Sequence, residues 1–409
     1  MYDENISYKS LKRMNMKNTR LILCLSFLSF GILKAQIVNI PDPNFKAYLV
    51  NNPEINTNHD DEIQLSEAES FSGMIDCPDL EITDLTGIEA FVNIPNLNCY
   101  KNEISALDLS QNIALEFLDC SFNEILVLDL SKNTALKVLY CSLNKLSALD
   151  LSQNTALEFL DCSFNKISTL DLGHNTALEN LVFGFNKIAA LDLSHNTALE
   201  LLTCVANNLS SLDVSQNIAL KALVCEGNSL TSLDLSQNAA LVFLSCYNNE
   251  ISALDVSQNT ALKVLQCTEN ELKSLNLKNG NNINLKEFLV SNNPDLRCIE
   301  VDDVDLAYSM TRWSKDDTAE YSTDCLSSST TEFSLKETYF YPNPVEDILY
   351  FEEPMSDIRM MDYSGRMIQQ YEHATDRIYL ASLANGVYFV VGRTTSGEYI
   401  GGKVVKVGR

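Results

Sequence analysis

Residues 115–135 read LEFLDCSFNEILVLDLSKNTA, and close copies of this stretch fill the middle of the chain. Its central phrase, Leu-Asp-Leu-Ser, recurs every 21 residues from Leu107 to the variant copy at Leu275. Self-similarity at one fixed period is typical of a solenoid. A single unit of this length buries too little apolar surface to offset its conformational entropy. The copies must therefore stack, so that each unit covers its neighbours.

Each unit has two halves with similar spacing. Leu115, Leu118, Cys120 and Asn123 form the pattern LxxLxCxxN, and the second half repeats it as IxxLxLxxN. The central residues of each half alternate between apolar and polar, which is the period of a strand. About ten residues separate the halves, too few for a strand, two turns and a helix. We therefore predict short parallel strands on two faces of a flattened coil, without helices.

Asparagine closes each half, in one register that begins at Asn102 and another that begins at Asn112. A carboxamide donates and accepts hydrogen bonds, so both registers predict structural ladders that satisfy turn backbone. Cysteine occupies one inward position of the repeat, and Phe183 replaces it once, as a core position allows. We expect packed thiols there, the alternative being a metal array or a row of disulfides. The position holds Cys99, Cys120, Cys141, Cys162, Cys204, Cys225, Cys246 and Cys267.

In these motifs residues 82–294 resemble the leucine-rich-repeat family, specifically its 21-residue bacterial class with a nested LxxLxLxxN half-repeat. The motif recurs in register about nine times, which makes the resemblance specific. Two departures are Phe183 in the cysteine register and a two-residue insertion around residues 280–282. We assign residues 99–294 to the solenoid.

The chain of 409 residues carries 29 basic and 55 acidic residues, a net charge of −26. This charge argues against nucleic acid or an anionic membrane as a partner. Residues 16–36 have the pattern of a secretory signal, with Lys17 and Arg20 before an apolar run over residues 21–33. That run is too short to span a bilayer, and no other stretch is long enough. We assign residues 1–35 to an amino-terminal extension and signal peptide.

Residues 36–98 are expected to cap the solenoid with a short helix over residues 46–50 and a second beginning at Ser66. The intervening segment resembles an EF-hand calcium loop, although Asp61 stands where such a loop has glycine. The alternative is a solvated acidic turn with a helix cap. The residues at the calcium-ligand spacing are Asn56, Asn58, Asp60, Glu62 and Glu67. We expect no other cofactor.

Residues 295–325 lack the repeat and form the expected exit cap. Cys298 and Cys325 flank this segment, and a disulfide between them is expected in an oxidising compartment. Residues 326–338 are rich in serine and threonine and are predicted to be a linker.

A variable face of the solenoid is the candidate binding surface. The Leu-Asp-Leu-Ser half is nearly constant, whereas outward positions of the other half combine aromatic rings with carboxylates. Exposed aromatic side chains on a rigid sheet favour recognition; the alternative is that single exposed apolar residues are ordinary. The predicted face comprises Phe117, Asp119, Tyr140, Phe159, Asp161, Thr203, Phe243 and Tyr247.

Residues 339–409 change character to short β-rich runs separated by turns, which predicts a small antiparallel Ig-like β-sandwich. Two strands are expected over residues 348–351 and 358–361, among others, with hairpin turns at Ser364-Gly365 and Ser396-Gly397. The segment resembles the type A carboxyl-terminal sorting domain of the type IX secretion system. The resemblance is carried by Pro342, Asn343, Pro344, Gly365, Gly386, Tyr388, Lys403 and Lys406. It implies type IX secretion machinery as a partner, export across the outer membrane of a Bacteroidetes-type cell, and removal of the domain.

Together these features predict a mainly β, secreted or cell-surface protein with no transmembrane segment in its mature form. No nucleophile elbow, HExxH, phosphate loop or paired acid–base signature is present, so we expect no enzymatic activity. The expected function is non-catalytic binding or adhesion to an extracellular protein or glycan. The alternative is a structural surface protein without a single ligand.

Overall fold

The computed structural model describes residues 36–325, 334–335, 340–363, 366–371, 373–395 and 399–408. The expected signal peptide and most of the expected linker lie outside these residues. The chain divides into two compact units, residues 1–323 and 324–409, and each is described by itself.

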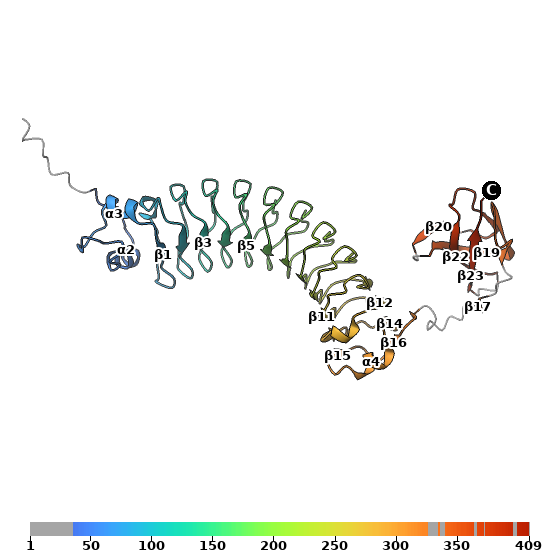
Figure 1. The fold of residues 1–409 in the computed structure, drawn as a ribbon. Coiled ribbons are helices and arrows are strands. Elements are labelled where there is room, and N and C mark those ends of the chain that lie inside the picture. The colour runs from blue at the N-terminus through green and yellow to red at the C-terminus, as the bar shows by residue number, and fades with distance from the viewer. Residues whose placement is uncertain are drawn as a thin grey trace, which may run out of the picture. The chain divides into compact units, whose positions relative to one another are not determined.

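The first unit is a solenoid whose main feature is a 12-stranded parallel sheet (Figure 1). No α-helix interrupts the coils between its second and eleventh strands, so the prediction of helix-free coils is confirmed. The sheet has more rungs than the sequence has copies of Leu-Asp-Leu-Ser, because both caps add strands to it. In spatial order the strands are β1 Met74–Asp76, β2 Asn96–Asn98, β3 Phe117–Asp119, β4 Val138–Tyr140, β5 Phe159–Asp161, β6 Asn180–Val182, β7 Leu201–Thr203, β8 Ala222–Val224, β9 Phe243–Ser245, β11 Val264–Gln266, β13 Glu287–Leu289 and β15 Trp313–Ser314.

The second face of the coils carries a shorter parallel sheet of four strands. Strands therefore occur on two faces, as predicted, but on this face only toward the carboxyl end of the solenoid. In the earlier coils the described residues form no strand in this half; the bond from the serine amide to the aspartate is common to both kinds of coil, as between Ser110 N and Asp108 Oδ1 at 2.9 Å and between Ser257 N and Asp255 Oδ1 at 2.8 Å. The four strands are β10 Ala253–Asp255, β12 Ser274–Asn276, β14 Cys298–Glu300 and β16 Glu320–Ser322.

The core is a set of columns that run along the solenoid. In β3 to β8 the central residue is buried and its two neighbours are half-buried. All eight cysteines of the inward register are fully buried and free, and Phe183 fills the same column. Burial raises the pKa of the Cys204 and Cys246 thiols to about 12. The prediction that these thiols pack in the core is confirmed.

The two asparagine ladders differ. In the first, Asn123 Nδ2 donates to the carbonyls of Cys99 (3.0 Å) and Cys120 (3.1 Å), and Asn123 Oδ1 accepts from Ile104 N at 3.0 Å. In the second, Asn133 Nδ2 donates to Leu109 O and Asn112 O, at 3.1 and 2.9 Å. Its buried Oδ1 has no partner among the described residues, and the same holds along this ladder. The expectation that every ladder carboxamide both donates and accepts is wrong for the second register.

The entry cap contains α2 (Pro43–Val50), α3 (Leu65–Ser70) and the 3-10 helix η1 (Ile88–Ala90). Asp42 caps α2, since its Oδ1 accepts from the amides of Asn44 and Phe45 at 2.9 Å. Its Oδ2 accepts from Thr83 N at 2.8 Å and Thr83 Oγ1 at 2.9 Å. One carboxylate thereby fixes the helix to the chain that enters the first coil.

The exit cap contains α4 (Val304–Ser309), and the 3-10 helix η2 (Asn282–Asn284) lies at the two-residue insertion. The Trp313 ring contacts Phe288 edge-on with centroids 5.3 Å apart, and its Nε1 donates to Leu285 O at 2.9 Å. Tyr321 packs against the same indole at 5.9 Å. These rings close the end of the core. Cys298 and Cys325 are both disulfide-bonded.

The second unit is a mainly antiparallel sheet of seven strands with its own core. Two strands predicted separately are one, β19, because the chain passes Pro354 with shifts in register rather than a break. The amino-terminal part of β19 pairs with β18 and β21, and its carboxyl-terminal part with β20 and β22. The expected Ser364-Gly365 and Ser396-Gly397 turns lie outside the described residues. The strands are β17 Ser334–Leu335, β18 Phe340–Tyr341, β19 Ile348–Asp362, β20 Met367–Tyr371, β21 Thr375–Tyr379, β22 Gly386–Arg393 and β23 Tyr399–Lys406.

Of the described helices, none has the length and apolar character needed to cross a membrane.

Candidate ligand-recognition face

Three aromatic rings form a continuous cluster on adjacent strands β3, β4 and β5. Phe117 and Tyr140 lie with centroids 6.0 Å apart and planes tilted by 52°. Tyr140 and Phe159 are closer, at 4.6 Å and 37°. All three side chains are half-buried. The parallel register places Phe117 and Phe159 on either side of Val138, at the start of each strand.

Two carboxylates flank Tyr140 at the ends of the neighbouring strands. Register pairs Asp119 with Tyr140 and Tyr140 with Asp161. Each carboxylate accepts from the serine amide two residues on, at 2.9 Å. Burial raises the pKa of Asp119, against hydrogen bonds from Ser121 that lower it, and the charge of Asp161 raises it further. Burial and both carboxylates raise the pKa of Tyr140. The cluster is thus acidic, aromatic and partly desolvated.

The other three predicted face residues lie apart from this cluster. Thr203 is on β7 between Val182 and Val224, and Phe243 is on β9. Tyr247 follows β9, and a hydrogen bond to Glu269 raises its pKa. The structure therefore brings together five of the eight predicted residues. We call Phe117, Asp119, Tyr140, Phe159 and Asp161 the recognition face.

A second row of apolar side chains lies at the turn that follows these strands. Phe122, Leu143, Phe164 and Phe185 occupy the same position in four successive coils and are 45%, 37%, 45% and 47% exposed. Their φ angles are 58°, 53°, 53° and 55°, in the left-handed region. That conformation costs a residue with a Cβ roughly 1–2 kcal/mol. We call these four residues the left-handed ridge.

Sequence reasoning missed the ridge, although a signal was present. The ridge position directly precedes the first asparagine ladder, and later coils fill it with Ala206, Gly227 and Asn248. Glycine and asparagine are the residues that tolerate the left-handed conformation best. The position also holds Lys101 and Glu269, so the signal readable from the sequence is the run of four bulky apolar residues at a position that is otherwise polar or small.

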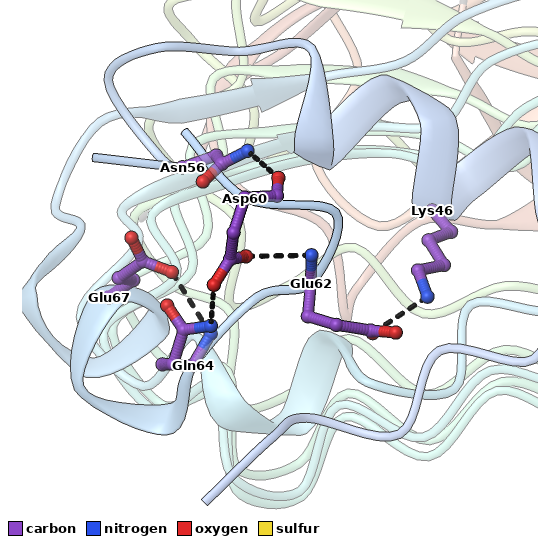
Figure 2. Close-up of polar contacts among 6 residues, drawn as sticks. All are labelled: Lys46, Asn56, Asp60, Glu62, Gln64 and Glu67. Atoms are coloured by element: carbon purple, nitrogen blue, oxygen red, sulfur yellow. Dashed lines mark hydrogen bonds and ion pairs between the residues drawn. The ribbon is translucent and has the colours of Figure 1, made fainter. Parts of the chain in front are cut away.

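The calcium-loop residues of the entry cap bond mainly to one another and to the loop (Figure 2). Glu67 Oε1 accepts from Thr57 N at 2.8 Å and Asn58 N at 3.1 Å, and Oε2 accepts from Gln64 N at 3.0 Å. Burial would raise the pKa of Glu67, but the hydrogen bonds from Gln64, Asn58 and Thr57 outweigh it and lower that pKa. Glu67 therefore closes the loop as a cap of α3.

Asp60 and Glu62 are engaged in the same way, but the buried Oδ1 of Asn56 has no partner among the described residues. Asp60 Oδ1 accepts from Glu62 N at 2.8 Å, and its Oδ2 accepts from Gln64 Nε2 at 2.9 Å. Lys46 Nζ lies 2.7 Å from Glu62 Oε2. Asn56 is 3% exposed and donates to Asp60 O at 2.7 Å.

The positive φ of the loop falls at His59 (61°), not at Asp61 where a calcium loop has its glycine. Within the described residues, no group of three or more His, Cys, Asp or Glu side chains is placed to hold a metal. The arrangement is the one expected of the helix-cap alternative, and calcium binding stays a prediction.

The predicted sorting-motif residues meet around β23. Asn343 Nδ2 donates to Lys403 O at 2.6 Å, and Val405 N donates to Asn343 Oδ1 at 2.8 Å. The peptide bonds before Pro342 and Pro344 are cis. Asn343 thus joins two motifs that lie about 60 residues apart in the chain.

The other motif residues lie on or beside the same strand pair. Gly386 pairs with Lys406 across β22 and β23, and Tyr388 Oη donates to Ala384 O at 2.9 Å. The Lys406 side chain is buried, and its Nζ donates to Val407 O at 3.1 Å. Gly365 lies outside the described residues.

Comparison with known proteins bears on both units. A family model described as a secretion system C-terminal sorting domain matches residues 339–406. No curated protein matches the sequence. An internalin, InlF, from Listeria monocytogenes is 20% identical over 70% of this chain and 99% of its own, with a TM-score of 0.54. The InlJ functional domain from Listeria monocytogenes, described as including a cysteine ladder, is 22% identical over 92% and 100%, with a TM-score of 0.39.

Proposed function

We propose that this chain, a leucine-rich-repeat protein with a type IX secretion sorting domain, binds an extracellular protein through the recognition face. The likeness to InlF shows the leucine-rich-repeat fold, and the sorting domain directs the chain to the cell surface or out of the cell. We propose further that the solenoid is non-catalytic and that binding is its function.

The observation that carries the proposal is the acidic aromatic cluster of β3 to β5. Tyr140 contacts both phenylalanine rings and lies between two carboxylates on a sheet fixed by hydrogen bonds on both sides. Rigid aromatic side chains lose little conformational entropy on binding and dominate the energy of many interfaces. The raised pKa of Asp119 means that its ionised form is held at a cost to folding.

The test is affinity capture from native culture medium, followed by measurement of the affinity for each protein retained. We expect the combined variant Phe117→Ala, Tyr140→Ala and Phe159→Ala to lose the partner. Its midpoint of unfolding should shift by only a few degrees, because the rings are half-exposed. The matched control is Val264→Ala, a half-buried outward residue on β11.

A partner that binds the triple variant and the parent equally would contradict this assignment. Retention of glycans but no protein would replace the protein ligand with a carbohydrate. If neither is retained, and deletion of the protein alters cell-surface properties, the structural alternative is correct.

A further inference from the structure

We propose that the left-handed ridge, with a row of lysines beside it, is a second docking site, and that it takes an acidic, apolar-rich extended peptide segment of a protein partner. The ridge shares no residue with the recognition face. It combines exposed apolar side chains in four successive coils with lysines in the last three of them, whereas Glu124 stands at the lysine position of the first.

The lysines follow the ridge through three coils. Lys145, Lys166 and Lys187 each come two residues after a ridge residue, with one asparagine of the first ladder between them. All three side chains are exposed. Lys145 pairs with Glu124. Among the described residues, neither Lys166 nor Lys187 forms an ion pair.

Both features end at the same coil. After Phe185 and Lys187 the two positions hold Ala206 and Asn208, and in the following coils Gly227 with Ser229 and then Asn248 with Glu250. Loss of the apolar residue and the lysine together is not required by the fold, because the later coils stack in the same register. The pairing of the two features therefore points to a shared ligand.

The positive charge of the lysines beside the ridge determines which charge the bound segment should carry. A chain with a net charge of −26 repels acidic partners over most of its surface, so two neighbouring lysines that form no ion pair with a described residue, Lys166 and Lys187, favour an anionic segment there. Asp119 and Asp161 of the recognition face are instead held by the amides of Ser121 and Ser163. The two sites thus differ in charge as well as in residues.

The geometry of the rings favours a peptide over a sugar. Phe164 and Phe185 stack with centroids 4.2 Å apart and planes only 10° from parallel, so their facing surfaces cover each other. A sugar packs on an open ring face, whereas aliphatic side chains also pack on ring edges, so covering these faces favours the peptide. Four rungs spaced about 4.8 Å apart span roughly 14 Å, the length of four or five extended residues.

The test uses purified full-length chain and a fluorescent peptide of about eight residues in which Asp alternates with Leu, long enough to cover the four rungs. Its matched controls replace Asp with Lys or Leu with Ser. We expect the Asp–Leu peptide to bind at least tenfold more tightly than either control, and the affinity to fall as salt rises.

Two pairs of substitutions separate the contribution of the phenylalanine rings to peptide binding from that of the lysines. Phe164→Asn with Phe185→Asn should weaken binding at least tenfold while keeping the fold, because asparagine already occupies this position at Asn248. Lys166→Asn with Lys187→Asn should weaken binding and flatten its salt dependence. Ile218→Thr, an exposed residue at the other corner of the coil, is the control and should change nothing.

Equal binding of the Asp–Leu peptide by the parent and the phenylalanine pair would overturn the proposal. So would equal binding of the Asp–Leu and Lys–Leu peptides. Binding of phosphatidylglycerol vesicles without binding of the peptide would replace the protein segment with a lipid surface. The triple variant of the recognition face should bind the peptide normally, so failure of one proposal is distinguishable from failure of the other.

Discussion

Asp119 lies at the end of β3 with its carboxylate half-buried beside Tyr140. A charge at this position is unfavourable for folding, although the residue belongs to the recognition face. Burial raises the folded-state pKa of Asp119, so its ionisation is less favourable in the folded chain than in the unfolded one. The contribution of this residue to folding is therefore most favourable below the unfolded pKa and falls as the pH rises through the folded pKa.

We expect Asp119→Asn to raise the midpoint of thermal unfolding slightly at pH 7 and to have a smaller effect at pH 3. An asparagine oxygen can still accept the Ser121 amide, so the turn is kept. The measurement is thermal unfolding of parent and variant at both values of pH. The affinity of the same variant for the protein partner of the recognition face should fall. A stability that drops at pH 7 would show that the ionised carboxylate supports the fold.

At the scale of the element, the entry cap depends on two carboxylates that hold backbone amides. Hydrogen bonds outweigh burial and lower the pKa of both Asp42 and Glu67 below the ordinary values of 3.8 and 4.5. For a lowered pKa the stabilisation is complete above the unfolded value and is lost as the pH falls through the folded value. The cap should therefore lose this stabilisation in acid.

We expect Glu67→Gln to cost about 1–3 kcal/mol, because one acceptor oxygen becomes a donor that faces amides. Hydrogen exchange of α2 and α3 amides between pH 7 and pH 3 measures the effect. The variant should show a smaller change with pH than the parent. The exposed Glu69→Gln is the matched control.

The same experiment tests the calcium loop. With the cap closed by its own hydrogen bonds, chelator should leave the exchange rates unchanged. Protection that rises with calcium in the parent, and does not rise in Asp60→Asn, would instead establish the calcium site.

The sequence predicted the elements best where a residue's role depends only on the period. Leu118 and Cys120 face the core because alternation within a repeat fixes the inward side. The unpaired oxygen of Asn133 could not be predicted, since it depends on which carbonyls the neighbouring coil presents. The contact between Tyr140 and Phe159 needed the register of adjacent strands. The span of β19 across Pro354 needed its partner strands, because proline at a shift in register does not end a strand.

At the scale of the whole molecule, each coil of the solenoid bonds only to the coils before and after it. Stability should therefore be close to a sum of terms for coils and their interfaces. Deletion of residues 207–227 joins Ala206 to Asn228 and restores the ladder pattern, with one rung removed.

We expect this 21-residue deletion to fold and to lower the denaturant dependence of unfolding by about one twelfth, in proportion to the surface lost from 12 strands. The recognition face on β3 to β5 should keep its affinity. The control removes only residues 207–226, which shifts the register by one and turns apolar residues outward. If both deletions unfold in the same way, the coils are not independent units.

The column of buried thiols bears on how the chain matures outside the cytoplasm. In a coil without its neighbours, the cysteine thiol is accessible to solvent and to oxidants. Once the next coil stacks on it, the same thiol is buried. Since the eight repeat cysteines lie 21 residues apart or a multiple of that, a partly assembled chain offers many wrong cross-links and a finished one offers none of them. We therefore expect slow stacking of the coils to lower the yield of correctly paired protein even where the folded solenoid is stable.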